Sequence, residues 1–357
     1  MELIKYLDDF NERDWQYTSE GTVRLALVGL GWWTVDMVLP AVKDSDLCCT
    51  TTVVSSSKNK AEKTASSEAT IEHAITYEEF HDGEAKEAFD AVYIATPNAR
   101  HLEYAETAAK LGKDVLCEKP MEATAERAQR LVSVCDSNDV LLMIAYRVQT
   151  QPAIRRAREL IDNGFIGKPV QAYGSYSQPL LGMFSNPDQW RLDSDLSGYG
   201  TSIMDLGIYP INTLRFLLRS DPTAVTAQTE SFHEDFSDVS DERSAYTLTF
   251  ENGTHAVCTA SQNAYGDSQL KLTGTDGQID LSPVFNGECT LELARSNTTV
   301  QISFENVDEM KEEFDYFADK ILCSGSVFPD GQHGLVDMRT LQAIYRAARS
   351  GQVEQIK

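Results

Sequence analysis

The sequence predicts an α/β protein, with a doubly wound parallel sheet in its first half and, in its second, an α+β domain with a large, mostly antiparallel open sheet. In residues 23–146, compact apolar runs alternate with helix-like segments, which is typical of a parallel sheet. After Tyr146, consecutive β-like runs are joined by short turns, which is typical of antiparallel hairpins. The 357 residues suffice for two domains. We expect an N-terminal arm over 1–22 and domains over 23–146 and 147–357.

The elements of the first half follow from continuous apolar runs. Residues 23–28 form such a run between turn residues, which predicts a buried strand. The other expected strands are 51–54, 74–76, 91–95, 114–117 and 140–145, and the expected helices are 37–42, 101–111 and 124–137.

The second half begins with an expected helix over 152–163 and a strand over 169–178. A helix over 205–218 is expected to cover one face of the sheet. The other face has little sequence left to cover it, so we expect a homo-oligomer, a dimer or tetramer, joined through the open sheet. The remaining expected strands are 223–231, 243–250, 254–262, 268–274, 288–294 and 299–304, and the final helices are 308–323 and 334–349.

Composition narrows the class of protein. Fifty-five acidic against 31 basic residues give a net charge of −24, which disfavours nucleic-acid binding. Because the acidic residues are spread along the chain, we expect a halophilic enzyme, with an ordinary acidic enzyme as the alternative. No apolar run approaches the roughly 20 residues of a membrane span, and the polar N-terminus does not resemble a secretory signal. Seven cysteines without a Cys-x-x-Cys pair are typical of reduced thiols and predict a cytoplasmic protein.

A glycine-rich turn directly follows the first strand. In Gly29-Leu30-Gly31, the first glycine permits a tight turn and the second lets the backbone approach a pyrophosphate at the start of a helix. An ordinary strand-to-helix turn is the alternative, but the strand context favours a Rossmann dinucleotide-binding domain over 23–146. The third glycine of the usual fingerprint is replaced by Thr34. The expected cofactor contacts here are Gly29, Gly31, Trp32, Trp33 and Thr34.

The end of the second strand distinguishes between cofactors. An NAD site usually places a carboxylate there, whereas this chain has Ser55, Ser56, Ser57 and Lys58. Hydroxyl and ammonium groups suit a 2′-phosphate, so these four residues predict NADP. A solvated lysine cluster at a helix start is the alternative.

Two more segments end strands on the side of the sheet where open parallel sheets bind ligands. The first contains Thr96, Pro97, Asn98 and His101, which we expect beside the cofactor. A lone His at a helix start is also commonly structural, and no spacing of His, Cys and carboxylates predicts a metal site.

The second segment is Glu118-Lys119-Pro120. A lysine facing a cofactor cleft can lower the pKa of a substrate hydroxyl through its charge. We therefore expect Glu118 and Lys119 at the cofactor, with Lys119 also contacting substrate. The proline can be cis. A surface lysine before a helix is the alternative for this dipeptide alone.

Taken in order, these motifs, with Trp190-Arg191 and Asp205-x-Gly207-x-Tyr209, resemble the glucose–fructose oxidoreductase / inositol dehydrogenase (Gfo/Idh/MocA) family over essentially the whole chain. The resemblance implies that Lys119 is catalytic and that Asp205 orients the substrate. It also implies that Trp190 and Arg191 lie near the nicotinamide end of the cofactor.

At several positions the chain departs from the family pattern, including Ser197-Gly198-Tyr199-Gly200, where members usually have three glycines. Many members carry His where this chain has Tyr209. This departure resembles the sugar 1-dehydrogenases, glucose–fructose oxidoreductase and dihydrodiol dehydrogenases, and it argues against an inositol dehydrogenase. Arg147 takes a position often held by Asn, and we include it among the substrate contacts.

The resemblance implies an NADP-dependent aldose 1-dehydrogenase acting on a sugar such as D-xylose, with residues 147–357 as the substrate-binding and oligomerisation domain. Hydride would pass from the anomeric carbon to nicotinamide C4. Tyr209, its pKa lowered by Lys119, would remove the anomeric proton, and a lactone would form. The alternatives are a glucose–fructose oxidoreductase with retained cofactor, a trans-dihydrodiol dehydrogenase and a non-catalytic NADP-sensing regulator.

Overall fold

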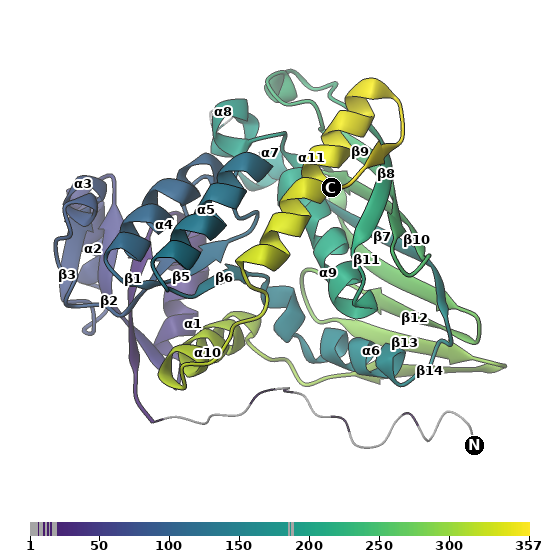
Figure 1. Ribbon diagram of the computed structural model, residues 1–357, viewed down its shortest axis with the longest axis horizontal. Coiled ribbons are helices and arrows are strands. Elements are labelled where there is room, and N and C mark those ends of the chain that lie inside the picture. Colours follow the sequence, from purple (N-terminus) through teal and green to yellow (C-terminus); the bar gives the residue numbers. More distant parts are fainter. Residues whose placement is uncertain are drawn as a thin grey trace. The chain divides into compact units, whose positions relative to one another are not determined.

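The computed structural model describes residues 6, 10, 13, 15, 20–184, 186 and 189–357, so the expected arm over 1–22 lies largely outside the described residues. The chain forms two compact units, here called the six-strand unit and the nine-strand unit after their sheets (Figure 1). The six-strand unit comprises Trp15–Arg147 and Asp308–Met338, and the nine-strand unit contains Val148–Val307 and Arg339–Lys357. The segment 308–338, expected in the second domain, thus belongs to the six-strand unit.

The six-strand unit is built on a parallel sheet with the order β3-β2-β1-β4-β5-β6, as the alternation of strands and helices predicted. The central strands β1 and β4 are almost wholly buried, which explains their continuous apolar sequences. The strands are β1 Val23–Val28, β2 Cys48–Ser55, β3 His73–Thr76, β4 Ala91–Ile94, β5 Asp114–Glu118 and β6 Leu142–Ala145.

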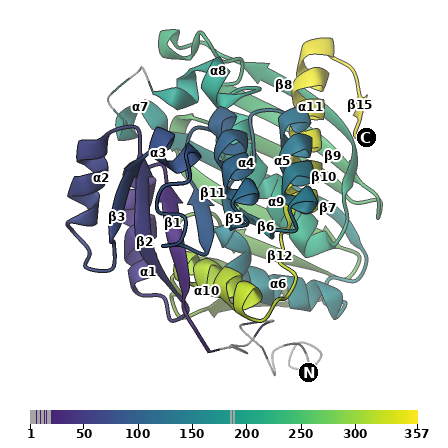
Figure 2. The same cartoon turned by 60° about the vertical axis from the view of Figure 1, so that its left-hand side comes forward.

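Side-chain caps begin several helices of this unit. Ser57 and Thr124 each accept a hydrogen bond from the backbone of the following first turn, and Thr76 forms a capping box with Glu79. The α-helices are α1 Leu39–Lys43, α2 Lys58–Ala65, α3 Tyr77–His81, α4 His101–Lys110 and α5 Ala125–Ser137 (Figure 2). The unit also contains the π-helix η2 Thr34–Val38, the 3₁₀-helix η3 Asn98–Arg100 and the first residue of η4 Arg147–Thr150.

Helix α10 (Glu309–Leu322) comes from late in the sequence and packs against α1, β1 and β2. Its Met310, Phe314 and Phe317 belong to the same buried cluster as Leu25 and Leu27 of β1. The six-strand unit is therefore completed by a segment about 160 residues after β6, which explains why residues 308–338 belong to it.

The nine-strand unit contains one open sheet with the order β14-β13-β12-β11-β7-β10-β9-β8-β15. Every neighbouring pair is antiparallel except β7 and β10, so the predicted mostly antiparallel sheet is confirmed. The strands are β7 Pro169–Pro179, β8 Pro222–Glu230, β9 Arg243–Phe250, β10 His255–Ser261, β11 Asn263–Gly274, β12 Gly277–Ser282, β13 Thr290–Arg295, β14 Thr298–Ser303 and β15 Glu354–Gln355.

Helices α6 and α9 pack together, and α9 lies against β7. At their contact with the sheet, Gly174 is needed because a Cβ there would lie 2.7 Å from Pro210. The helices are α6 Pro152–Asp162, α7 Leu180–Met183, η5 Trp190–Leu192, α8 Ser194–Ser197, the π-helix η6 Ile203–Gly207, α9 Ile208–Leu218, η7 Glu234–Phe236 and α11 Gly331–Ser350, which begins in the segment 308–338. Among the described residues, no helix combines the length and apolar character that crossing a membrane requires.

Candidate functional site

The glycine-rich turn of the six-strand unit has the local geometry that a dinucleotide requires. Gly29 adopts φ +95°, and a Cβ there would lie 2.6 Å from the carbonyl oxygen of Ala95. At Gly31 a Cβ would meet no atom within 4 Å, so the backbone is open on that side. The hydroxyl of buried Thr34 donates to the Gly29 carbonyl at 2.6 Å, and this hydrogen bond stabilises the turn on its buried side. The residue that replaces the third glycine thus holds the turn that would bind a pyrophosphate.

The polar residues after β2 divide into buried and exposed members. Ser55 is buried, whereas Ser56, Ser57 and Lys58 are exposed. Ser57 caps α2, and Lys58 pairs with Glu79 at 2.8 Å. Ser56 therefore offers an exposed hydroxyl at the end of the strand, where the ribose of a dinucleotide would bind.

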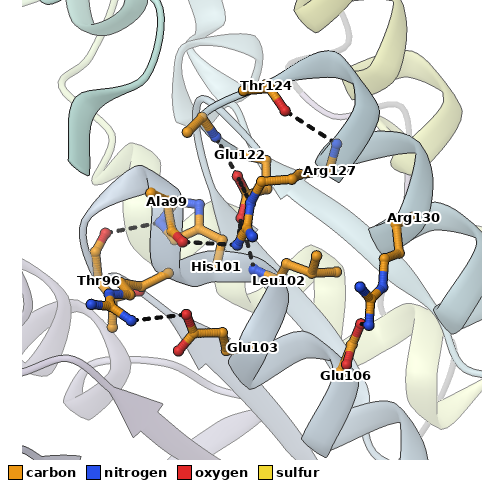
Figure 3. A network of polar contacts seen from close by, with 12 residues as sticks. Thr96, Ala99, His101, Leu102, Glu103, Glu106, Glu122, Thr124, Arg127 and Arg130 are labelled. Carbon is orange, nitrogen blue, oxygen red and sulfur yellow. Dashed lines mark hydrogen bonds and ion pairs between the residues drawn. The ribbon is translucent and has the colours of Figure 1, made fainter. Parts of the chain in front are cut away.

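The segment from Thr96 to His101 is held by a polar network (Figure 3). His101 is 1% exposed, and its Nε2 bonds to the Thr96 carbonyl at 2.9 Å. Burial lowers the pKa of His101, so its ring is neutral. Behind it, fully buried Glu122 pairs with Arg127 and accepts a hydrogen bond from the backbone of Leu102. His101 thus shapes the strand end from the interior of the unit.

Glu118 is the centre of a second network in the same unit. Its Oε1 accepts hydrogen bonds from the indole Nε1 of Trp33 at 3.0 Å and from the hydroxyl of Tyr93 at 2.7 Å. Its Oε2 accepts the backbone N–H of Lys119 at 3.1 Å. Tyr93 is fully buried, and burial followed by the charge of Glu118 raises its pKa well above the ordinary value. Tyr93 therefore remains a donor, and the Glu118 carboxylate accepts these hydrogen bonds from residues of the six-strand unit.

A second acid lies near this network. Glu313 of α10 is 2% exposed, and its Oε1 has no hydrogen-bond partner. Burial raises the pKa of Glu313 well above its usual value, and the charge of Glu118 adds to the effect, while Arg147 acts against it. The raised pKa favours the protonated form of Glu313, which avoids two buried negative charges close together.

Lys119 follows Glu118 directly, is half-buried and precedes a cis proline. Arg147, expected as a substrate contact, forms an ion pair with Glu309 and lies with its guanidinium 5.6 Å from the ring centre of Trp33. Within the six-strand unit, Arg147 thus connects the turn residue Trp33 to the start of α10.

In the nine-strand unit, Asp205 lies in the π-helix η6, and two side chains hold its carboxylate. Its Oδ2 accepts hydrogen bonds from Arg191 Nε at 2.9 Å and from Gln262 Nε2 at 2.8 Å. Both members of the Arg191–Asp205 pair are largely buried, with 17% and 14% of their side chains exposed. Arg191 was expected at the cofactor with Trp190, and its guanidinium lies 4.5 Å from the Trp190 ring centre. The structure assigns Arg191 a carboxylate partner that the sequence did not indicate.

Tyr209 lies one helical turn after Asp205, on α9. It is 9% exposed. Its ring packs edge-on against Tyr176, at 5.3 Å between centroids, and in a tilted arrangement against Phe285, at 5.5 Å. Sequence reasoning missed several described residues that interact with the expected site residues of each unit, among them Tyr93, Gln262 and Glu313. Tyr93 lies in an apolar strand, and Gln262 and Glu313 lie in no motif, so the sequence carries no signal for them.

Two family models match the chain. The description "Oxidoreductase family, NAD-binding Rossmann fold" covers residues 23–146, and "GFO/IDH/MocA C-terminal domain" covers residues 154–280. Among solved structures, an aldose–aldose oxidoreductase from Caulobacter crescentus, complexed with glycerol, superposes with a TM-score of 0.87 at 25% identity, over 94% of this chain and 99% of that chain. The match extends over both units.

Two relatives are sugar dehydrogenases by name. A D-xylose 1-dehydrogenase [NADP(+)] of Haloarcula marismortui is 52% identical over 345 residues, which is 96% of each chain. The D-xylose 1-dehydrogenase (NADP(+)) 2 of Haloferax volcanii is 30% identical over 75% of this chain and 80% of that protein. Similarity of this extent, together with the turn at Gly29 and the residues around Lys119 and Asp205, shows that the chain belongs to the GFO/IDH/MocA family of oxidoreductases.

Proposed function

We propose that the protein is an NADP-dependent aldose 1-dehydrogenase that oxidises D-xylose at the anomeric carbon to the lactone. The observation that supports it most is the 52% identity, over 96% of each chain, with the Haloarcula D-xylose 1-dehydrogenase. The open face at Gly31 and the exposed hydroxyl of Ser56 fit the pyrophosphate and ribose of a dinucleotide. A nicotinamide cofactor bound there would supply the hydride acceptor.

The residues of the chain would supply the acid–base chemistry and the orientation. Tyr209 takes the proton of the anomeric hydroxyl, and the ammonium of Lys119 stabilises the negative charge that develops on that oxygen. Asp205 binds a sugar hydroxyl, and its bonds to Arg191 and Gln262 fix the direction of its carboxylate. Proton removal and hydride departure together convert the anomeric C–OH into the lactone C=O.

A screen of aldoses with NADP⁺ and NAD⁺ at high salt, following absorbance of the reduced cofactor, tests the proposal. We expect D-xylose with NADP⁺ to give the highest kcat/KM, and lactone to appear as product. Turnover of no aldose would contradict the proposal. Reaction between two sugars through a cofactor that co-purifies and never exchanges would instead favour a sugar–sugar oxidoreductase.

The choice of cofactor is tested separately at Ser56. Ser56→Asp places a carboxylate where we propose that the 2′-phosphate binds, so NADP⁺ should bind more weakly by about 1.5–3 kcal/mol, with little change for NAD⁺. Ser66→Asp, at the end of the same helix, is the matched control because it adds the same charge away from the strand end. A wild-type preference for NAD⁺ would contradict the assignment.

We further propose that the protein is a homo-oligomer joined through the outer face of its nine-strand sheet. In-register residues Thr247, Val257, Tyr173 and Lys271 run across that face, and Val257 and Tyr173 are 50% and 39% exposed. Val257→Asp should dissociate the assembly in light scattering, whereas Val353→Asp, at another exposed valine, should not. A wild-type monomer in high salt would contradict this proposal.

We propose a cytoplasmic location on the basis of the thiols. All seven cysteines are free, and four of them are buried. Thiols in this state are typical of a reducing compartment. Fractionation of the producing cells, with activity or antibody as the readout, tests the location, and recovery outside the cytoplasm would contradict it.

A further inference from the structure

The helix that carries Asp205 and Tyr209 begins on a carboxylate from a distant segment. Helical structure starts at Ser202, and the backbone N–H groups of Thr201 and Ile203 donate to the carboxylate of Asp241 at 2.7 and 2.8 Å. The first N–H groups of a helix have no partner within it, and a carboxylate there satisfies them and favours the helix dipole. Asp241 thus acts as a cap supplied from the segment that leads into β9.

Tyr345 holds the same carboxylate from the opposite end of the chain. Its hydroxyl, on α11, donates to Asp241 Oδ2 at 2.5 Å. Asp241 is fully buried and Tyr345 is 1% exposed. Space around them is so limited that a Cβ at Gly200 would lie 2.6 Å from the Tyr345 hydroxyl and also overlap Asp241. The glycine just before the helix is therefore required by this pair.

The residue after Asp241 extends the connection to the candidate site. Ser202 donates its hydroxyl to the Glu242 carbonyl at 3.0 Å, and the same hydroxyl accepts the backbone N–H of Gln262 at 2.9 Å. Gln262 in turn donates to Asp205 through its side chain at 2.8 Å. The Ser202 hydroxyl thus links the start of the helix to Gln262, whose side chain orients Asp205.

We propose that Asp241 and Tyr345 are positioning residues of the oxidoreductase reaction, which set the start of the helix and through it the carboxylate of Asp205 and the hydroxyl of Tyr209. The kinetic test of this inference rests on the proposed function. Its geometry rests on the contacts of Asp241 and Tyr345 described above. A small displacement at a helix start moves every side chain that the helix presents, and a misplaced catalytic group loses much of its effect.

The charged groups around Asp241 and Tyr345 make the positioning of the helix start sensitive to pH. Burial raises the pKa of Asp241 to about 6, although its hydrogen bonds from Ile203, Tyr345 and Thr201 act against the rise. Burial followed by the charge of Asp241 raises the pKa of Tyr345 well above its ordinary value, so the tyrosine remains a donor.

Further titratable groups face this region: Tyr199, whose ring centre lies 5.8 Å from that of Tyr345, and also Tyr246 and Glu242. Tyr246 of β9 is kept protonated by burial, which raises its pKa, and it donates to the Gly207 carbonyl. Burial acts to raise the pKa of Glu242, but hydrogen bonds from His233 and Phe232 bring it below its usual value. Asp241, with a pKa raised to about 6, thus changes charge near neutrality.

Tyr345→Phe tests the inference because it removes one donor and leaves the ring packing. Loss of that bond raises the pKa of Asp241, so the acid limb of the kcat/KM profile for sugar should move to higher pH. We expect kcat to fall by roughly 2- to 30-fold, as for other residues that act through a coupled network. NADP⁺ affinity should be unchanged. Tyr104→Phe, at a buried tyrosine of the six-strand unit, is the matched control and should keep the wild-type profile.

A second measurement needs no activity. Amide hydrogen exchange at Thr201 and Ile203 should be faster in Tyr345→Phe, and faster still in Asp241→Asn, whose amide can accept on one side only. Equal exchange in wild type and Tyr345→Phe, or an unmoved acid limb in an active Tyr345→Phe enzyme, would overturn the inference. A wild type that oxidises no aldose would refute the proposed function instead, and the exchange rates would still decide the positioning role.

Discussion

The two units hold their central carboxylates in different ways. In the six-strand unit, the side chains that bond Glu118 are the neutral donors Trp33 and Tyr93, and a second buried acid, Glu313, has a pKa that burial and the charge of Glu118 raise. In the nine-strand unit, Asp205 is bonded by a cation, Arg191, and by a neutral amide. The difference shows that one unit accommodates its acids with neutral donors and a raised pKa, and the other adds a positive charge.

The largest effects are expected where each unit contributes its candidate catalytic residue. Tyr209→Phe and Lys119→Ala should each lower kcat by roughly 10²–10⁴, the range for general acid–base catalysis. NADP⁺ affinity, measured by fluorescence titration, should change little in the Tyr209 variant. A Tyr209→Phe enzyme with near-wild-type kcat would remove this tyrosine from the mechanism.

Arg191→Met sharpens the comparison because it removes the cation from Asp205. One charge-assisted hydrogen bond contributes about 1.5–3 kcal/mol, so sugar kcat/KM should fall by a corresponding factor. Binding of NADP⁺ should be unaffected if the guanidinium works through Asp205. Weakened NADP⁺ binding with an unchanged sugar KM would restore the role at the cofactor that the sequence suggested.

Glu313→Gln tests the raised pKa of the buried acid in the six-strand unit. Because the folded-state pKa of Glu313 is raised above its unfolded value of about 4.5, its contribution to stability is full below that value and is lost as pH rises toward the folded-state pKa. Glutamine has no proton to lose, so the variant should gain stability over the wild type as pH increases. Urea unfolding at several pH values measures the difference. A gap that does not grow with pH would show that Glu313 is ionised in the folded protein.

Salt should have a smaller effect, and on the surface rather than on either buried cluster. The charge of −24 is spread along the chain, and the screening length falls from about 10 Å at 0.1 M to about 3 Å at 1 M salt. Repulsion between surface carboxylates weakens, so the melting temperature should rise from 0.1 to roughly 2 M KCl. The difference between wild type and Glu313→Gln should persist in both salts. An unchanged or lower melting temperature in brine would contradict the halophilic interpretation.

The parallel sheet was predictable because its strands are buried on both faces and read as continuous apolar runs, as in β1 and β4. Strand β12 was missed, since Gly277 at its start reads as part of a turn. The π-helical stretches at Thr34 and Ile203 were also missed, because no local sequence signal distinguishes them from an α-helix.

The placement of Gly29, Ser56 and Lys119 directly after strands was predictable because motifs mark these positions, while their binding roles stay predictions. Their partners were not, because a contact such as Gln262 with Asp205 joins positions 57 residues apart and depends on sheet register. The same limit applies to Arg191. An arginine suggests an anionic partner, but the partner here is the carboxylate of Asp205 in the same chain.

Helix α10 also constrains the order in which the polypeptide can fold during synthesis. A ribosome that has made all six strands has not yet made Met310, Phe314 and Phe317, which fill the core beside β1. Until they emerge, the nascent sheet presents an uncovered apolar surface, the kind of intermediate that aggregates or recruits chaperones. A fragment ending at Arg147 lacks these side chains, so the unit can reach its native core only after the ribosome has translated β7 to β14 of the other sheet.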